Sequence, residues 1–234
     1  MFAIYKRELA TYFHTPIGYV FCAIFLALAG AVFSYTTLFS MTADVTSYFT
    51  YMLVLLVILV PILTMKLFSE ERKQKTEQLL LTAPVSLYAM VGGKFLAAYT
   101  LFAACTLTSF SSFFILYLYA DVKTAVLFGN LVALLLLGMT FIAIGLFVSA
   151  LTENQLAAAI GTVAILLVLL LISLVNSIIP VYWIRFVFSS ISVFARFQNF
   201  TQGVFDFSAL LYYLSVAAAF LYLTVRVFDK RRWG

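Results

Sequence analysis

The residues of this chain that could do chemistry are concentrated in one charged stretch. Residues 69–78 read Ser-Glu-Glu-Arg-Lys-Gln-Lys-Thr-Glu-Gln, and they lead into Leu-Leu-Leu-Thr-Ala-Pro at 79–84. Glu70 and Glu71 are adjacent carboxylates, a residue type used in general acid–base catalysis and in metal binding. His14 is the only histidine of the chain, so no histidine-based metal cluster can form beside them. We therefore predict no catalytic, cofactor-binding or metal-binding residues, and expect this stretch to bind a partner.

Two further classes of activity are disfavoured by missing patterns. The sequence contains no Gly-x-x-x-x-Gly-Lys-Ser/Thr loop, so if ATP drives this protein, another chain must bind the ATP and its magnesium. Ion-coupled transport leaves ionisable residues in the middle of membrane spans, and the centres of the apolar segments of this chain contain none. A secondary transporter or an ion channel is therefore disfavoured.

The composition indicates that the rest of the chain lies in a membrane. The chain has 234 residues, of which 65% are hydrophobic and 10% are charged, and its mean hydropathy is +1.12. Soluble domains carry about a quarter of their residues as charges. The expected fold is an all-α integral membrane protein that forms a single transmembrane domain over residues 1–234.

Six apolar stretches are long enough to cross a bilayer, which takes about 20 residues of helix. They are residues 17–39, 49–67, 90–119, 125–151, 155–177 and 208–228. The breaks at 121–123 and 152–155 are short, so the helices on either side of each break are expected to be antiparallel neighbours.

The positive residues indicate the orientation of these spans. Of the 14 Lys and Arg residues, only Lys123, Arg185 and Arg196 fall on the side away from the termini. Both termini and the charged stretch are therefore expected in the cytoplasm. The net charge of +5 then follows from topology and from contact with anionic lipids, and no nucleic-acid partner is predicted.

Two segments are neither spans nor simple loops. Residues 1–15 place Phe2, Tyr5, Leu9 and Tyr12 on one helical face, which predicts an amphipathic helix in the membrane interface. Residues 177–207 are too apolar for an open loop, and we expect short re-entrant helices there on the outer side.

Small residues in the fourth and fifth spans offer faces for close helix approach. They include Gly138, Gly145 and Gly161. Packing within one molecule is one interpretation, and a homodimer seam is the other.

Several short motifs now support a family comparison. They are Tyr-Lys-Arg-Glu-Leu at 5–9, Tyr-Phe-His-Thr-Pro at 12–16, Glu-Glu-Arg at 70–72, Thr-Glu-Gln-Leu-Leu-Leu-Thr-Ala-Pro-Val-Ser at 76–86, Gly-Lys-Phe at 93–95, Leu-Thr-Glu-Asn-Gln at 151–155 and Arg-Arg-Trp at 231–233. In this order the chain resembles the membrane subunits of ABC transporters of the ABC-2 (type V exporter) class, and is most similar to gliding-motility-type ABC permeases. One departure is Lys75, where such permeases often carry Gly.

The resemblance implies that the loop at 67–89 forms a coupling helix that docks on an ATPase subunit. The residues that match this interface are Glu70, Glu71, Arg72, Lys73, Thr76, Glu77, Leu79, Leu80, Leu81 and Pro84, with a second cytoplasmic turn at Glu153, Asn154 and Gln155. It also implies that residues 1–15 are an interfacial elbow helix and that 177–207 cap the exit.

The residues of this loop agree with that interpretation. Thr76 can N-cap a helix that begins near Glu77 and ends at Pro84, and the leucines at 79–81 would anchor it. The alternative is a solvated linker, against which an exposed leucine triplet argues. We hypothesise that Glu77 and Leu80 transmit the stroke of the ATPase.

The implied function is that of a permease subunit of an ATP-driven exporter in the bacterial cytoplasmic membrane. Its expected partners are two ATPase copies, which carry ATP and magnesium, a second permease copy or a paralogue, and membrane lipids. The alternatives are a membrane scaffold or immunity protein that binds a soluble partner without transport, and a small channel. The aromatic-rich spans favour a lipidic, peptide or amphipathic cargo.

Overall fold

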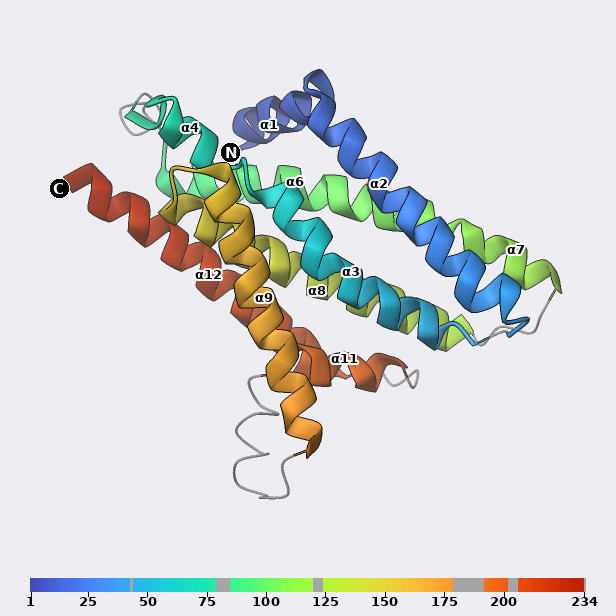
Figure 1. The fold of residues 1–234 in the computed structure, drawn as a ribbon. Coiled ribbons are helices and arrows are strands. Elements are labelled where there is room, and N and C mark those ends of the chain that lie inside the picture. The colour runs from blue at the N-terminus through green and yellow to red at the C-terminus, as the bar shows by residue number, and fades with distance from the viewer. Residues whose placement is uncertain (43, 79–84, 120–123, 179–191, 202–205, 234) are drawn as a thin grey trace.

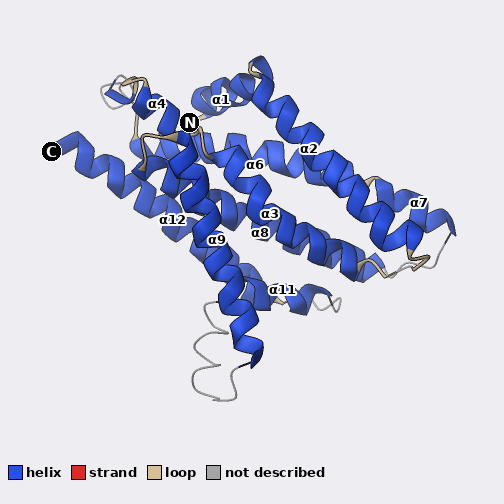
Figure 2. Cartoon of the chain, in the orientation of Figure 1, coloured by secondary structure: helices blue, strands red, loops and turns tan. Residues whose placement is uncertain are grey.

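The chain folds as a bundle of helices in the computed structural model, which describes residues 1–42, 44–78, 85–119, 124–178, 192–201 and 206–233. These residues form helices, turns and short connections, with no strand among them (Figure 2). Six of the described helical stretches are long and apolar enough to cross a membrane. The predicted all-α integral membrane fold is thereby confirmed.

The spans follow the predicted ones closely. The helices are α1 (Phe2–His14), α2 (Pro16–Phe33), the π-helix η1 (Ser34–Phe39), α3 (Thr46–Thr64), α4 (Ser69–Lys73), α6 (Leu87–Phe110), α7 (Ser112–Tyr119), α8 (Thr124–Leu151), α9 (Gln155–Ile178), α11 (Val193–Thr201) and α12 (Phe207–Trp233).

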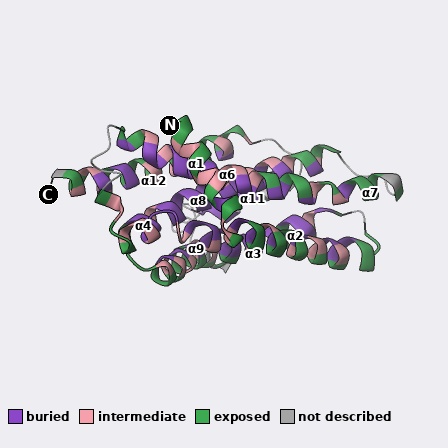
Figure 3. Ribbon diagram, turned by 90° about the horizontal axis from the view of Figure 1, so that it is seen from above, coloured by how far each residue is buried: buried purple, intermediate pink, exposed green. Residues whose placement is uncertain are grey.

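Helix α8 is the centre of the bundle, and α3, α6, α9, α11 and α12 pack around it. Of the 18 consecutive residues that make up the most apolar part of α8, 72% are buried within the protein, compared with 17% for α9. A helix that is apolar on every side belongs in the interior of a bundle. Figure 3 shows the buried surface concentrated on the central helices, whereas the outer helices expose one side.

The glycines of α8 serve packing inside the molecule. A Cβ atom at Gly138 would lie 2.1 Å from Phe102 of α6, and one at Gly145 would lie 2.2 Å from Thr64 of α3. Gly161 of α9 faces Val148 of α8. The structure therefore favours intramolecular packing over a homodimer seam at these positions.

Helix α1 is the N-terminal helix that its amphipathic pattern predicts. It ends at the extended residue Thr15, and α2 begins with Pro16, whose fixed φ suits a first helical position. Tyr12 is buried, and Tyr5 and Leu9 pack against the core. Much of the apolar face of α1 is thus turned toward the protein rather than only toward lipid.

Both termini, α4 and the turn between α8 and α9 lie at one end of the bundle, which we call the terminal end (Figure 1). Asn154 caps the N-terminus of α9, because its Oδ1 accepts a hydrogen bond from the Leu156 N–H at 3.0 Å. Helices α8 and α9 pack against each other across this short turn, as expected.

Parts of two predicted segments lie outside the described residues. The turn at 121–123 does, and so do 179–191 and 202–205 of the expected re-entrant segment. Within that segment α11 is a short helix, with Phe194, Phe197 and Phe200 buried in the core.

The close approach of α6 to α8 can be tested by adding one methyl group. We expect Gly138→Ala to lower the free energy of unfolding by about 1–3 kcal/mol, because the added Cβ overlaps the Phe102 ring. Gly30→Ala is the matched control, since a Cβ there meets nothing within 4 Å. Chemical unfolding in detergent measures both variants, and equal stabilities would contradict this account of the packing.

Candidate functional site

The second span is interrupted near the terminal end of the bundle. Helix α3 ends at Thr64 and α4 begins at Ser69, so the regular helix is interrupted at residues 65–68, within a candidate span that runs to Lys73. The Met65 N–H still bonds the Pro61 carbonyl, and the Leu67 N–H bonds the Thr64 carbonyl. We call residues 65–68 the span break. Buried irregular backbone is stable only where protein or water satisfies its polar groups. The partners of these groups therefore define how this region is built.

Ser149 of α8 bonds both sides of the break. Its Oγ accepts hydrogen bonds from the N–H groups of Phe68 at 3.1 Å and Ser69 at 3.2 Å. The same hydroxyl donates to the Met65 carbonyl at 3.2 Å, which also accepts from the Ser69 hydroxyl. One buried side chain of the central helix thus replaces several of the lost backbone bonds.

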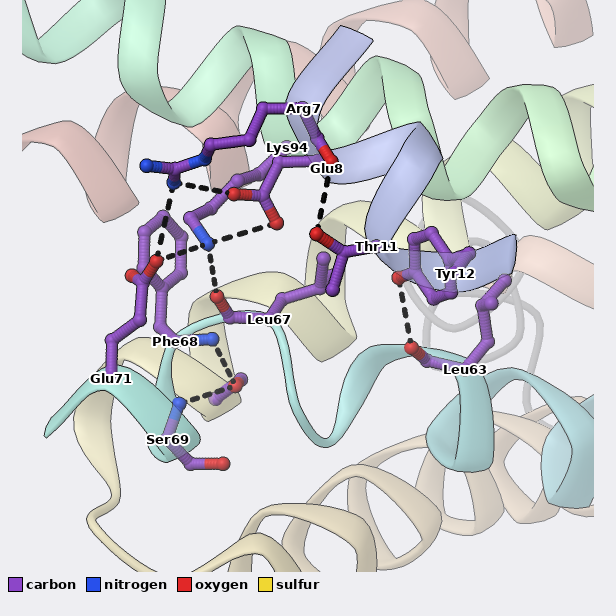
Figure 4. Close-up of polar contacts among 11 residues, drawn as sticks. Arg7, Glu8, Thr11, Tyr12, Leu63, Leu67, Phe68, Ser69, Glu71 and Lys94 are labelled. Atoms are coloured by element: carbon purple, nitrogen blue, oxygen red, sulfur yellow. Dashed lines mark hydrogen bonds and ion pairs between the residues drawn. The ribbon is translucent and has the colours of Figure 1, made fainter. Parts of the chain in front are cut away.

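Two longer side chains, from α1 and α6, reach two further carbonyls near the break (Figure 4). The Tyr12 hydroxyl donates to the Leu63 carbonyl at 3.3 Å, and Lys94 Nζ donates to the Leu67 carbonyl at 2.7 Å. Burial raises the pKa of Tyr12, so this phenol keeps its proton and its role as a donor. Helices α6 and α8 are therefore bonded to the break, and α1 is bonded to the end of α3 beside it.

Lys94 is also the centre of an ion cluster. Its side chain is 2% exposed, and its Nζ lies 2.8 Å from Glu71 Oε1 and 3.2 Å from Glu8 Oε2. The ammonium group also lies 5.1 Å from the centre of the Phe68 ring. A buried ammonium is tolerated because its donors meet two carboxylates and a carbonyl.

Arg7 completes this cluster from α1. Its Nη2 lies 2.7 Å from Glu8 Oε1 and 3.6 Å from Glu71 Oε1. The hydrogen bond to Glu8 raises the pKa of the Arg7 guanidinium. Arg7, Glu8, Glu71 and Lys94, which we call the charge cluster, carry no net charge together, and they join α1, α4 and α6.

Two further arginines hold the end of α8. Arg72 donates to the Leu151 carbonyl at 2.8 Å and pairs with Glu153 at 2.8 Å. Arg231 of α12 donates to the Ala150 carbonyl at 2.7 Å and pairs with Glu77 at 2.9 Å. Cations stabilise a helix C-terminus, where the last carbonyls lack partners.

Helix α4 ends in a Schellman motif. The Thr76 N–H bonds the Glu71 carbonyl at 2.9 Å and the Lys75 N–H bonds the Arg72 carbonyl at 3.1 Å. Lys75 has φ 57°, in the left-handed region that favours glycine. A glycine at this position would therefore fit the backbone that the structure shows.

The predicted interface residues are used in different ways. Glu71, Arg72 and Glu77 are bonded within the molecule, whereas Lys73 and Lys75 are exposed. Glu70 lies 3.8 Å from Lys66, and the Thr76 hydroxyl donates to the Glu71 carbonyl at 3.2 Å. The two described residues of the expected coupling helix, 77–78, are helical. Leu79, Leu80, Leu81 and Pro84 lie outside the described residues, so their docking role and the capping role of Thr76 stay predictions.

The sequence-based reasoning missed the residues that hold this region together. In the sequence, Lys94 contributed only to the orientation of the spans and to the Gly-Lys-Phe motif, and Tyr12 only to an apolar helical face. Ser149 and Arg231 were given no role in holding the loop. A usable signal did exist for Lys94, because an ionisable residue within an apolar helix needs a partner.

Among the described residues, no group of three or more His, Cys, Asp or Glu side chains could hold a metal ion. The comparisons with known proteins point to a transport component. A family model described as ABC-2 family transporter protein matches residues 3–233. No curated protein matches the chain.

Removing the buried ammonium tests the charge cluster. We expect Lys94→Met to lower the free energy of unfolding by roughly 3 kcal/mol, because Glu8 and Glu71 lose their shared partner. Lys6→Met, at an exposed position of α1, should change it little. Adding Glu71→Gln to Lys94→Met should recover part of the loss, and purely additive effects in chemical unfolding would contradict coupling between the two residues.

The left-handed residue gives a stabilising variant. Lys75→Gly should raise the free energy of unfolding by about 0.5–1 kcal/mol, since glycine adopts this conformation without steric cost. Lys73→Gly is the matched control, because residue 73 is helical and glycine should destabilise it. The Lys75 assignment fails if both variants shift the thermal midpoint in the same direction.

Proposed function

The chain belongs to the ABC-2 family of transporter proteins, and from that premise we propose that it is the permease subunit of an ATP-driven exporter. In this proposal two ATPase subunits bind ATP and magnesium, and a second permease copy or a paralogue completes the transport path. The terminal end of the bundle faces the cytoplasm of a bacterium. Residues 69–84 form the docking segment for the ATPase.

The observation that carries this proposal is the way in which the described part of the segment is held. Glu71 bonds Lys94 of α6, Arg72 bonds the end of α8, and Glu77 bonds Arg231 of α12. Through Arg7 and Glu8, the same cluster reaches α1. A displacement of residues 69–78 would therefore be transmitted to four helices, α1, α6, α8 and α12. A solvated linker needs no such attachments.

The exposed residues of the segment indicate the chemistry of the partner surface. Lys73 and Lys75 are exposed, while Glu71 and Glu77 are largely covered and the Glu70 side chain is 37% exposed. A docked partner would thus meet a basic surface, and an acidic groove would complement it. The leucines at 79–81 would supply the apolar anchor, as the sequence predicts.

Charge reversal at Lys73 and Lys75 tests this assignment. In the complex with its ATPase, we expect Lys73→Glu with Lys75→Glu to weaken ATPase binding at least about tenfold, because like charges would meet across the interface. Transport-linked ATP hydrolysis should fall with it, while membrane insertion stays normal. Lys230→Glu, an exposed lysine of α12 outside the segment, is the matched control.

The second measurement is co-purification with an ATP-binding subunit. Recovery of such a subunit with the wild-type chain, and its loss with the double variant, supports the permease function. Two results would instead favour a scaffold that binds another soluble protein. One is a chain that is stable without an ATP-binding partner. The other is transport-linked ATP hydrolysis that survives both the double variant and the replacement of Glu77 and Leu80.

A further inference from the structure

A cavity of about 680 Å³ opens beside the span break. Its walls come from α1, from the start of α2, from the span break, from α4 and the turn after it, and from Lys94 of α6, which is the region drawn in Figure 4. The volume is within the range of small-molecule sites, about 300–1,000 Å³. The buried Lys94 forms part of its wall, so the cavity has a fixed polar floor rather than an open loop surface.

The cavity wall carries both signs of charge in equal number. Its bases are Arg7, Lys66 and Lys94, and its acids are Glu8, Glu70 and Glu71. A simple anion would meet three carboxylates there, and a simple cation would meet three bases. A ligand that carries one positive and one negative group matches this wall better than either.

Some of these groups keep unused bonding capacity. Lys66 Nζ and Glu70 Oε2 are 3.8 Å apart, which is longer than a hydrogen bond, and their side chains are 30% and 37% exposed. Glu70 Oε1 accepts a long hydrogen bond from Gln74 Nε2 at 3.5 Å, which leaves Oε2 for a ligand. Among the described residues, the ion pairs of Arg7 use Nη2, which leaves its Nε and Nη1 for a ligand. The cavity thus offers two cationic donors and one carboxylate acceptor to a guest.

The surroundings of the cavity favour a lipid as that guest. Thr11, Thr15 and Ile17 line the side where α1 turns into α2. Next to this turn Phe13 is 45% exposed and Tyr19 is 60% exposed, and the six candidate spans place this protein in a bilayer. Acyl chains can continue along such an apolar surface while the head group enters the cavity.

We propose that this cavity binds the phosphoethanolamine head group of a membrane phospholipid. Arg7 and Lys66 bond the phosphate, and Glu70 accepts hydrogen bonds from the primary ammonium group. Phosphatidylcholine has the same charges, but its methylated nitrogen has no N–H to donate to Glu70. A phosphatidylglycerol head group has no ammonium at all. The proposal does not depend on an ATPase partner.

Native mass spectrometry of the full-length chain in detergent tests this proposal. Lipids with matched acyl chains and ethanolamine, choline or glycerol head groups are titrated against the protein. We expect the ethanolamine lipid to bind about tenfold more tightly than the choline lipid, the value of one charge-assisted hydrogen bond. Equal binding of the three lipids would overturn the proposal.

Two variants locate the site by different signatures. Glu70→Gln should remove most of the preference for ethanolamine over choline, whereas Lys66→Gln should weaken both lipids and keep the preference. Asp229→Asn and Lys230→Gln, on α12 away from the cavity, are the matched controls. A preference that survives Glu70→Gln, or that is lost equally in the controls, would place the lipid elsewhere.

A soluble competitor separates the two sources of this head group. Glycerophosphoethanolamine carries the same phosphate and amine without acyl chains. If the ligand is a lipid, this competitor should not displace it at equal concentration. The competitor lacks the acyl chains, whose burial supplies most of the binding free energy of a lipid. Displacement at equal concentration would instead assign the cavity to a soluble ligand. Because no ATP is present, failure here leaves the permease proposal untouched.

Discussion

A helix that is interrupted inside a folded protein must find new partners for its freed backbone groups, and the rest of this structure depends on how that requirement is met. The second span breaks at residues 65–68. Lys94 and Ser149 bond backbone groups in the break, and Tyr12 bonds the end of α3 just before it. These side chains come from α1, α6 and α8. The interruption that would weaken an isolated helix therefore becomes the point at which four helices are joined.

The charges near the break follow from the same constraint. A lysine that reaches a buried carbonyl needs carboxylates around it, and Glu8 and Glu71 provide them. Arg72 and Arg231 act in a similar way on the last carbonyls of α8. Much of the charge that looks like a docking surface in the sequence thus holds the bundle together, and the exposed surface of the segment is smaller and more basic.

Most of the fold could be predicted from the sequence, because membrane spans depend on local composition. The six spans, the helix at the N-terminus and the tight turn before Gln155 agree with the structure. The short helix α4 was not predicted separately, since its five residues are too few to show a periodic pattern. Only part of the candidate site could be predicted from the sequence. The charged loop was identified, but its partners on α1, α6, α8 and α12 were not.

The sequence by itself determined the class of the protein, the number of its spans and the position of its main polar loop. Each of these depends on whether a segment is more stable in lipid or in water, which residues close together in the chain decide. Only the tertiary structure decided that Glu71 meets Lys94 and that Glu77 meets Arg231, 154 positions further along the chain. Such pairs depend on how helices cross in space, and no local pattern of residue types records that geometry.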